Sequence, residues 1–174
     1  MLGFKSSRKT GRYFEIAVEV ARKCSTLDFN LKGKRERDFE FSLISHLKTS
    51  KTIRDNITDQ ISKDNVDKIK AVEFFGYKHR PDACIGVDGT AIELKVMQNS
   101  QTIREILGQA ICYRMHYRFV VLVIVNKNND IELVKRLKNK NDSENLMLRS
   151  LAEDLNIFTV FGPSDGKRNL VFVG

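Results

Sequence analysis

The sequence has few cysteines and no long apolar run, and each shortage argues against a class of protein. Cys24, Cys84 and Cys112 are too widely spaced for a paired-cysteine metal site and too few for a disulfide framework, so we expect free thiols in a reducing compartment. No stretch approaches the roughly 20 apolar residues that a membrane span needs, and the N-terminus lacks a continuous apolar segment after its positive charges. These absences predict a cytoplasmic protein without a membrane partner.

Positive charge is present in excess. The 174 residues include 30 Lys and Arg against 22 Asp and Glu, a formal net charge of +8, and most of the surplus lies in residues 1–70. Such a surplus favours a polyanionic partner, most simply nucleic acid, although a solvated basic surface without a partner is the alternative. With only two prolines, no internal repeat and no low-complexity tract, we expect a single domain over residues 1–174.

Apolar periodicity predicts an α/β fold with a mixed central sheet flanked by helices. The run 118–127 is β-branched without interruption, which is typical of a strand buried on both faces. The expected helices span residues 11–24 (where alternation also fits a strand), 34–48, 55–70 (a polar helix or a helix with a loop), 100–117, 130–140 and 143–155. The expected strands span 71–80, 82–87, 90–96, 118–127, 157–162 and 169–174, with a turn at 163–166 between the last two.

The stretch RPDACIGVDGTAIELK, residues 80–95, predicts a hairpin that separates apolar from polar side chains. Asp88 and Gly89 tolerate the positive φ of a two-residue type I′ turn. The expected pairs are Val87 with Thr90, Ile85 with Ile92, Cys84 with Glu93, and Asp82 with Lys95. Alternation places on one face Ala83, Ile85, Val87, Ile92, Leu94 and Val96, and on the other Asp82, Cys84, Glu93 and Lys95.

The polar face of this hairpin carries the parts of a metal-assisted hydrolase. Two neighbouring carboxylates disfavour joint ionisation unless a cation lies between them, and Mg²⁺ is typically held by one or two carboxylates plus substrate phosphates. Asp82 and Glu93 offer that pair, and the Leu94 carbonyl is a further oxygen ligand. Lys95 could hold or help deprotonate a water, or stabilise charge on a phosphate. The pattern therefore predicts phosphodiester hydrolysis.

Pro81-Asp82, followed after ten residues by Glu93-Leu94-Lys95, resembles the motif of the PD-(D/E)xK nuclease superfamily, which has the restriction-endonuclease-like fold. The core of that superfamily is a helix, three strands, a helix and a strand, similar to the order expected for residues 34–127. The resemblance implies a Mg²⁺- or Mn²⁺-dependent nuclease acting on DNA, or less often RNA. It also implies that Asp82 and Glu93 ligate the metal while Lys95 positions the water.

Two further patterns resemble branches of this superfamily. The expected helix at 34–48, which would be the first helix of that core, resembles the corresponding helix of archaeal-type Holliday junction resolvases. The acid of that helix would correspond to Glu36 or, one turn on, Glu40. Gln109 and Tyr113 fit the QxxxY signature of RecB-like and Cas4-like exonucleases, where the two side chains would orient a nucleic-acid strand. The alternative for Glu36 and Glu40 is a solvated helix edge without a metal role. The alternative for Gln109 and Tyr113 is a polar helix flank with a half-buried tyrosine. The cysteine cluster of Cas4-like members is missing, so the resemblance implies no iron–sulfur cluster.

We expect three parts within the domain: a basic helical part at about 1–70, a catalytic core at about 34–127, and C-terminal helices with a hairpin at about 130–174. Phosphate contacts are expected from the basic residues Arg8, Lys9, Arg12, Lys32, Lys34, Arg35 and Arg37.

The patterns do not decide the substrate. QxxxY favours an end-processing exonuclease, whereas the small size and the first helix favour a structure- or site-directed endonuclease, for which a homodimer would be natural. The rival is a nucleic-acid-binding module that keeps the nuclease fold without chemistry. A third possibility is an unrelated basic protein, in which Asp82, Glu93 and Lys95 would not converge.

Overall fold

The computed structural model describes residues 4, 8–28, 35–61, 67–128, 130–162 and 169–173, so that Lys32, Lys34 and the expected turn at 163–166 lie outside it. The helices are α1 (Arg12–Ser25), α2 (Glu36–Leu47), α3 (Lys51–Arg54), α4 (Ser100–Arg114), α5 (Ile131–Lys138) and α6 (Ser143–Leu155). The strands are β1 (Ile57–Asp59), β2 (Val72–Phe74), β3 (Tyr77–His79), β4 (Ala83–Ile85), β5 (Thr90–Met97), β6 (Phe119–Asn126), β7 (Ile157–Gly162) and β8 (Leu170–Phe172).

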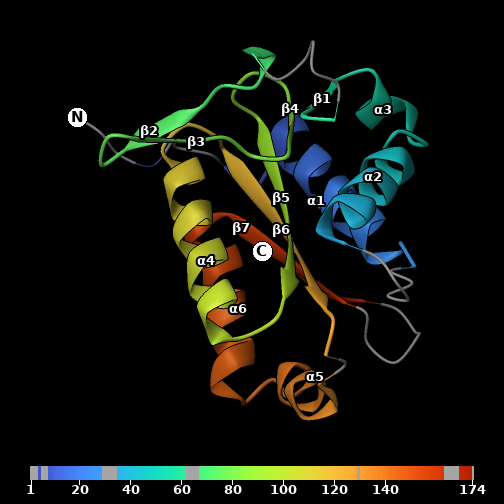
Figure 1. The fold of residues 1–174 in the computed structure, drawn as a ribbon, viewed down its shortest axis with the longest axis vertical. Coiled ribbons are helices and arrows are strands. Elements are labelled where there is room, and N and C mark those ends of the chain that lie inside the picture. The colour runs from blue at the N-terminus through green and yellow to red at the C-terminus, as the bar shows by residue number, and fades with distance from the viewer. Residues whose placement is uncertain are drawn as a thin grey trace.

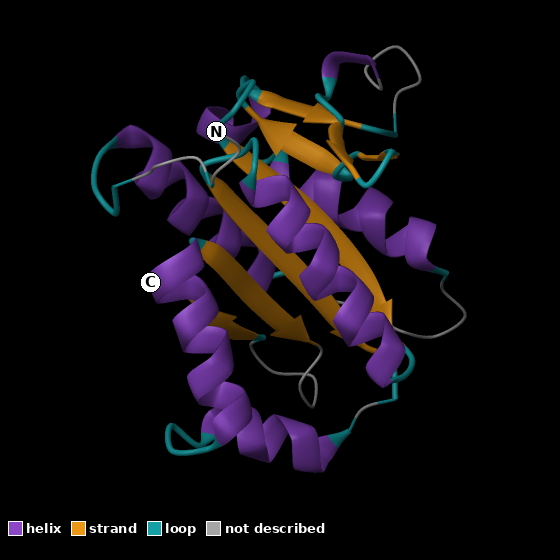
Figure 2. Cartoon of the chain, turned by 90° about the vertical axis from the view of Figure 1, so that its left-hand side faces the viewer, coloured by secondary structure: helices purple, strands orange, loops and turns teal. Residues whose placement is uncertain are grey.

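The protein has the expected α/β class, with a six-strand mixed sheet packed against helices (Figure 1). The strand order is β1-β4-β5-β6-β7-β8, in which β5, β6 and β7 run parallel and the other neighbours pair antiparallel. Helices α1 and α2 cover one face, and α4 and α6 lie over the other (Figure 2). Within the described residues, no helix is long and apolar enough to cross a membrane.

Strand β6 lies between two apolar cores, which explains its unbroken β-branched sequence. Val121, Val123 and Val125 pack into the core under α1 and α2, while Val120 and Leu122 belong to the core under α4. All eight residues of β6 are buried, as a central strand covered on both faces requires. The strand expected at 118–127 is confirmed, as are the helices expected at 11–24, 34–48, 100–117, 130–140 and 143–155.

The expectations for residues 55–80 are wrong in two respects. Residues 57–59 form β1, an edge strand paired with β4, where a polar helix was expected. Asp59 is buried there and forms an ion pair with Lys48 at 2.8 Å, which allows a polar sequence to occupy a sheet edge. Residues 71–80 form two strands, β2 and β3, which pair with each other in a separate two-stranded sheet. The third strand beside β4 and β5 is therefore β1.

The central hairpin has the expected faces but a different loop. Ile85 pairs with Thr90 and Cys84 with Ala91, so the loop holds four residues, 86–89, and Asp82 lies near the level of Glu93 instead of Lys95. A two-residue shift keeps every side chain on its face, because the side-chain period is two. Val87 is the exception, since it lies in the loop and is 78% exposed.

The loop is fixed by the start of β6. The backbone N–H of Arg118 donates to the carbonyl oxygens of Asp88 and Gly89 at 2.9 and 3.0 Å, and the Arg118 side chain forms an ion pair with Asp88 at 3.3 Å. A Cβ on Gly89 would collide with the carbonyl oxygen of Ile85. These long-range contacts favour the wider loop over the two-residue turn.

Candidate active site

The expected site residues meet where β4 leaves the edge of β5. Strand β4 begins at Ala83, opposite Ile92, so the later residues of β5 pair with β6 alone among the described strands. Two carboxylates replace the missing strand: the N–H of Leu94 donates to Asp82 Oδ2 at 2.8 Å, and the N–H of Val96 donates to Glu36 Oε2 at 3.0 Å. This uncovered edge brings an acid of α2 beside an acid of the hairpin.

Lys95 lies between the carboxylates of two elements. Its Nζ is 3.3 Å from Glu93 Oε1 and 3.2 Å from Glu36 Oε1, and its side chain is 25% exposed. Burial alone would lower the pKa of Lys95, but the charges of Glu93, Asp82 and Glu36 outweigh burial and raise it. The amine is therefore held in its protonated form.

Asp82 and Glu93 are acids that resist joint ionisation. Burial and then the charge of Glu93 raise the pKa of Asp82 to about 7, against the opposing hydrogen bond from the Leu94 N–H. Glu93 is 2% exposed, and burial raises its pKa although Lys95 and the Tyr113 hydroxyl favour the charged form. A cation between the two carboxylates would relieve both effects, since it favours the ionised forms.

The donor set fits Mg²⁺ or Mn²⁺ better than a metal that needs a closed protein cage. Across the described ranges, no group of three or more His, Cys, Asp and Glu side chains is arranged to hold a metal ion. Mg²⁺ keeps several waters and needs only one or two carboxylates plus substrate phosphates. Asp82 and Glu93 meet that need, and the Leu94 carbonyl points to the same strand edge as the Leu94 N–H that bonds Asp82.

Both candidate acids of α2 interact with this cluster, Glu36 by direct contact and Glu40 through its charge. Helix α2 starts at Glu36 because Asp38 Oδ2 accepts the N–H of Arg35 at 2.7 Å, which caps the helix. Glu36 then bonds Lys95 and the edge of β5, whereas Glu40 lies one turn on. Burial raises the pKa of Glu40, and the charges of Asp82 and Glu36 raise it further. Glu36 is thus a contact residue and Glu40 an electrostatic neighbour.

Gln109 and Tyr113 lie four residues apart on α4, as expected, and Tyr113 belongs to the cluster. The Tyr113 hydroxyl donates to Glu93 Oε2 at 3.1 Å, and the residue is 1% exposed. Burial and the charge of Glu93 raise the pKa of Tyr113. The Oε1 atom of Gln109 is buried and has no hydrogen-bond partner among the described residues, an arrangement that is uncommon for a buried polar atom. Contact of either side chain with a nucleic-acid strand stays a prediction.

The expected phosphate contacts divide into two groups. Arg35 and Arg37 are exposed on either side of Glu36, so they flank the cluster. Arg12 begins α1 next to Tyr13, whose ring lies 4.8 Å from the guanidinium of Arg118 near the start of β6. Arg8 and Lys9 precede it in the chain, and Lys32 and Lys34 lie outside the described residues. Among the expected phosphate contacts that the structure describes, Arg35 and Arg37 are therefore the two that adjoin a residue of the cluster in the chain.

Gln60 positions Asp82 and was not predicted. Its Nε2 donates to the carbonyl oxygens of Arg80 at 3.1 Å and Pro81 at 2.7 Å, and its N–H donates to the Asp82 carbonyl at 2.9 Å. These three bonds hold the segment that carries Asp82 against the end of β1. No local sequence signal could reveal them, because they depend on the pairing of β1 with β4.

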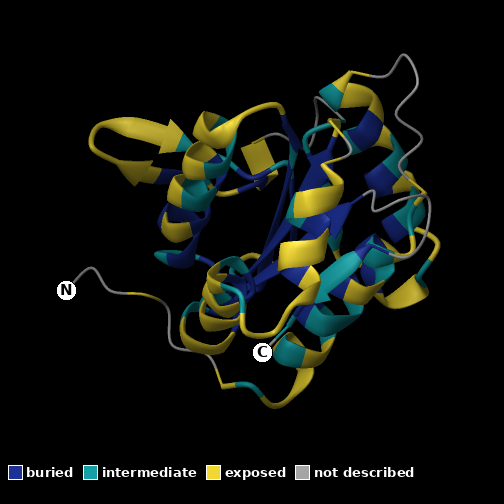
Figure 3. Cartoon of the chain, turned by 90° about the horizontal axis from the view of Figure 1, so that it is seen from below, coloured by how far each residue is buried: buried dark blue, intermediate teal, exposed yellow. Residues whose placement is uncertain are grey.

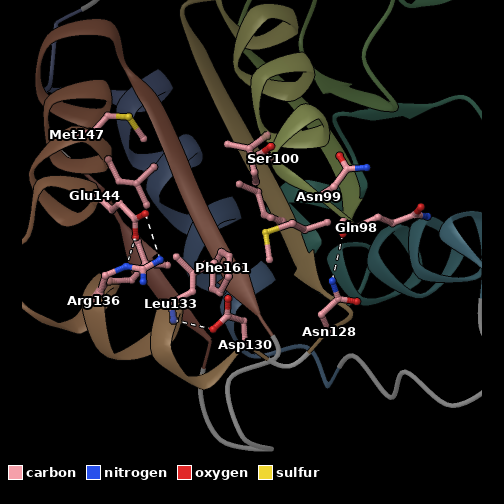
Figure 4. A pocket seen from close by; sticks show the side chains of 15 residues that line it. Gln98, Asn99, Ser100, Asn128, Asp130, Leu133, Arg136, Glu144, Met147 and Phe161 are labelled. Atoms are coloured by element: carbon pink, nitrogen blue, oxygen red, sulfur yellow. Dashed lines mark hydrogen bonds and ion pairs between the residues drawn. The ribbon is translucent and has the colours of Figure 1, made fainter.

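A pocket of about 370 Å³ lies beyond the end of β5, separate from the cluster (Figure 4). Its walls include Met97, Ile124 and Phe161, and at its rim Arg136 forms an ion pair with Glu144 at 3.0 Å. None of the expected catalytic residues lines it. Because its walls are largely apolar and its arginine is paired, the carboxylate cluster is the better candidate for phosphodiester chemistry.

Comparison with known proteins returned no match to a protein-family model, to a curated protein or to a solved structure. The function of the chain is therefore inferred from its residues and their geometry.

Proposed function

We propose that the chain is a metal-dependent nuclease that hydrolyses phosphodiester bonds in DNA. The observation that carries this proposal is the convergence of Asp82, Glu93 and Lys95 at the uncovered edge of β5, with Glu36 of α2 closing the cluster. A coincidental surface hairpin would not bury Glu93 or join it to helix α4.

The order of elements also supports a restriction-endonuclease-like arrangement. Helix α2, strands β1, β4 and β5, helix α4 and strand β6 follow one another in the chain as helix, three strands, helix and strand. Two insertions interrupt this series: the short helix α3 between α2 and β1, and the β2–β3 hairpin between β1 and β4. In this order the proposed ligands Glu93 and Leu94 lie in β5, and Asp82 directly precedes β4, the antiparallel neighbour of β5.

Each residue of the cluster has a role in this proposal. Asp82, Glu93 and the Leu94 carbonyl would hold Mg²⁺ or Mn²⁺, which polarises the phosphoryl group and lowers the pKa of bound water. Lys95 is kept protonated by the surrounding carboxylates, so it donates hydrogen bonds. It would orient the attacking water or stabilise charge that develops on the phosphate. Glu36 fixes the position of the Lys95 amine.

A cleavage assay on linear duplex, single strand, four-way junction and plasmid DNA tests the proposal. Purified protein should cut at least one substrate with Mg²⁺ or Mn²⁺ and none with EDTA. Glu93→Gln and Asp82→Asn should lose cutting while the folded proteins still bind DNA. Glu153→Gln, which changes a carboxylate on the exposed side of α6, is the matched control and should cut normally.

The same assay separates the rival functions. The substrate that is cut distinguishes an end-processing exonuclease from a junction- or site-directed endonuclease, and sedimentation with DNA tests whether cutting involves a homodimer. Folded protein that binds DNA but cuts nothing with either metal would favour the non-catalytic binding module. Cutting that persists in Glu93→Gln would assign the activity to another site or to a contaminant.

A further inference from the structure

The β2–β3 hairpin carries exposed aromatic side chains away from the body of the protein. Phe75 is 85% exposed, Tyr77 is 72% exposed and Phe74 is 37% exposed. Figure 3 shows both strands of the hairpin exposed and projecting to one side. The rings of Phe74 and Phe75 lie 4.3 Å apart, centroid to centroid, at 65°. The rings of Phe75 and Tyr77 contribute little to the core, and a contiguous exposed apolar patch is a candidate binding surface.

The turn of this hairpin contains an unfavourable residue. Phe75 and Gly76 have φ of 50° and 79°, so both central residues are in the left-handed region, as a type I′ turn requires. Asparagine or aspartate before glycine suits that turn, whereas a bulky residue at positive φ is strained. A phenylalanine at the tip therefore weakens the turn, and its exposed ring gains nothing from the core. Strain of this kind points to a role in binding.

The base of the hairpin is held firmly. Val72 is buried against α4, the Arg80 Nε–H donates to the Ile69 carbonyl at 3.1 Å, and the Tyr117 hydroxyl donates to the Lys70 carbonyl at 3.1 Å. The bonds of Gln60 to the Arg80 and Pro81 carbonyls anchor the other strand. The aromatic tip thus projects from a fixed platform.

Basic residues outnumber acidic residues in the segment that carries these rings. Residues 68–80 contain a single acid, Glu73, and the basic side chains Lys68, Lys70, Lys78 and Arg80. Aromatic rings interleaved with cations are the combination with which proteins bind single-stranded nucleic acid, since the rings stack on bases and the cations contact phosphates. This charge pattern favours nucleic acid over an apolar partner protein.

The hairpin lies within reach of a strand bound at the carboxylate cluster. Tyr77 and Phe75 precede Asp82 by five and seven positions, which limits the Cα–Cα distances to about 18 and 25 Å. At about 3.4 Å per nucleotide, a strand bound at Asp82 and Glu93 would pass the hairpin within roughly five to seven nucleotides.

We propose that Phe75 and Tyr77 stack on unpaired bases of DNA beside the carboxylate cluster, so that the preferred substrate contains a single-stranded segment. An intact duplex offers no exposed base faces for stacking, whereas a strand end, a flap or a junction arm does. The inference deepens the proposed function and rests on it for the position of the cut. The stacking step itself needs no cleavage and is measured separately.

The experiment compares DNA binding by two variants in EDTA, where no metal-dependent cutting occurs. In Phe75→Asn/Tyr77→Thr the rings are lost, while Asn-Gly suits the type I′ turn and threonine suits the strand, so the fold is kept. Phe41→Ala removes a 53% exposed ring from α2 as the control. Fluorescence anisotropy should show that the double variant binds single-stranded and forked DNA about 5- to 100-fold more weakly, and blunt duplex within about twofold of wild type.

A second measurement locates the contact. The fluorescence of 2-aminopurine within a single strand should be quenched on binding to wild-type protein and to Phe41→Ala, and should stay high with the double variant. Equal losses on all three DNAs, unchanged binding by the double variant, or an effect of the double variant on self-association alone would overturn the inference. If stacking is observed but no DNA is ever cut, the proposed function fails alone. If DNA is cut but the double variant binds DNA as tightly as wild type, the stacking inference is wrong and the proposed function still stands.

Discussion

The Tyr113 hydroxyl donates a hydrogen bond to Glu93 Oε2 at 3.1 Å, which joins helix α4 to the buried acid of β5. Lys95 contacts the other oxygen of Glu93, so the carboxylate is held at both oxygens. A carboxylate oriented in this way is prepared to bind a cation, and partners of metal ligands tune both affinity and activity.

We expect Tyr113→Phe to lower nuclease activity by about 10- to 100-fold, because Glu93 loses one of the groups that orient it. The loss should appear in kcat and in the Mg²⁺ concentration needed for half-maximal cutting, with little change in the KM for DNA. Steady-state cleavage at varied Mg²⁺ measures all three quantities.

Tyr117→Phe is the matched control for this prediction. Tyr117 is also fully buried, and its hydroxyl donates to the Lys70 carbonyl at 3.1 Å, away from Glu93. Each substitution should lower the free energy of unfolding by about 1 kcal/mol, the usual net value of one hydrogen bond. Only Tyr113→Phe should lower kcat and raise the Mg²⁺ requirement, because Tyr117 anchors the β2–β3 hairpin and its loss would act on DNA binding. Equal effects of the two variants on kcat would reduce Tyr113 to a structural role.

The two acids of α2 should respond differently to removal of their charge. Glu36→Gln removes the partner that fixes Lys95, so it should lower kcat and the melting temperature in EDTA. Glu40→Gln removes a negative neighbour of Asp82, so it should raise the melting temperature in EDTA and increase the Mg²⁺ required for cutting. Thermal denaturation and a Mg²⁺ titration of cleavage check both outcomes. If Glu40→Gln instead lowered kcat and the melting temperature while Glu36→Gln did not, Glu40 would be the acid that positions Lys95.

The site could be predicted from sequence to the extent that side-chain alternation determines it. Asp82, Glu93 and Lys95 were expected on one face, and the observed pairing keeps them there although the loop differs from the expected turn. The reason is that a shift by two residues preserves both faces. Alternation is a local property of each strand, so it is robust to errors in the loop.

Contacts between distant segments could not be predicted in the same way. Glu36 and Glu40 share one side of a helix, and only the approach of α2 to β5 distinguishes their contacts. Residues 57–59 are polar and look like part of a helix, yet pairing with β4 makes them an edge strand and brings Gln60 to Asp82. Such choices depend on tertiary pairing, which overrides local preference.

His46 should make stability depend on pH. Its Nε2 lies 3.1 Å from the Lys23 carbonyl and 3.0 Å from the Thr26 hydroxyl. Burial lowers the pKa of His46 below its usual 6.5, and the Lys23 charge lowers it further. Between the lowered pKa and 6.5 the unfolded chain binds more protons than the folded protein, so the free energy of unfolding falls as pH falls through that window.

Urea denaturation at several pH values from about 7.5 to about 5 tests this dependence against His46→Gln, whose amide can still donate to the Lys23 carbonyl. The wild type should lose more stability than His46→Gln as the pH falls, and the two should converge above the usual pKa of histidine. Other titrating groups are common to both proteins, so the difference isolates His46. Parallel curves would exclude His46 as a source of the pH dependence.

Mg²⁺ should stabilise the folded protein through Asp82 and Glu93. A ligand at 100 times its dissociation constant adds about 2.7 kcal/mol to the free energy of unfolding when it binds only the folded state. Asp82→Asn keeps an oxygen to accept the Leu94 N–H but removes one of two like charges. It should therefore melt higher than wild type in EDTA and gain little from Mg²⁺, because the unfavourable charge and the ligand disappear together.

Asp88→Asn, in the loop of the same hairpin, provides the control for this last prediction. It loses the ion pair with Arg118, so it should melt lower than wild type in EDTA, yet it should keep the full Mg²⁺-dependent increase because Asp88 lies outside the carboxylate cluster. Differential scanning calorimetry at constant ionic strength distinguishes specific binding from charge screening, which would act on every variant. An equal Mg²⁺ effect on wild type and Asp82→Asn would mean that the cation binds elsewhere, and the assignment of Asp82 as a metal ligand would then be wrong.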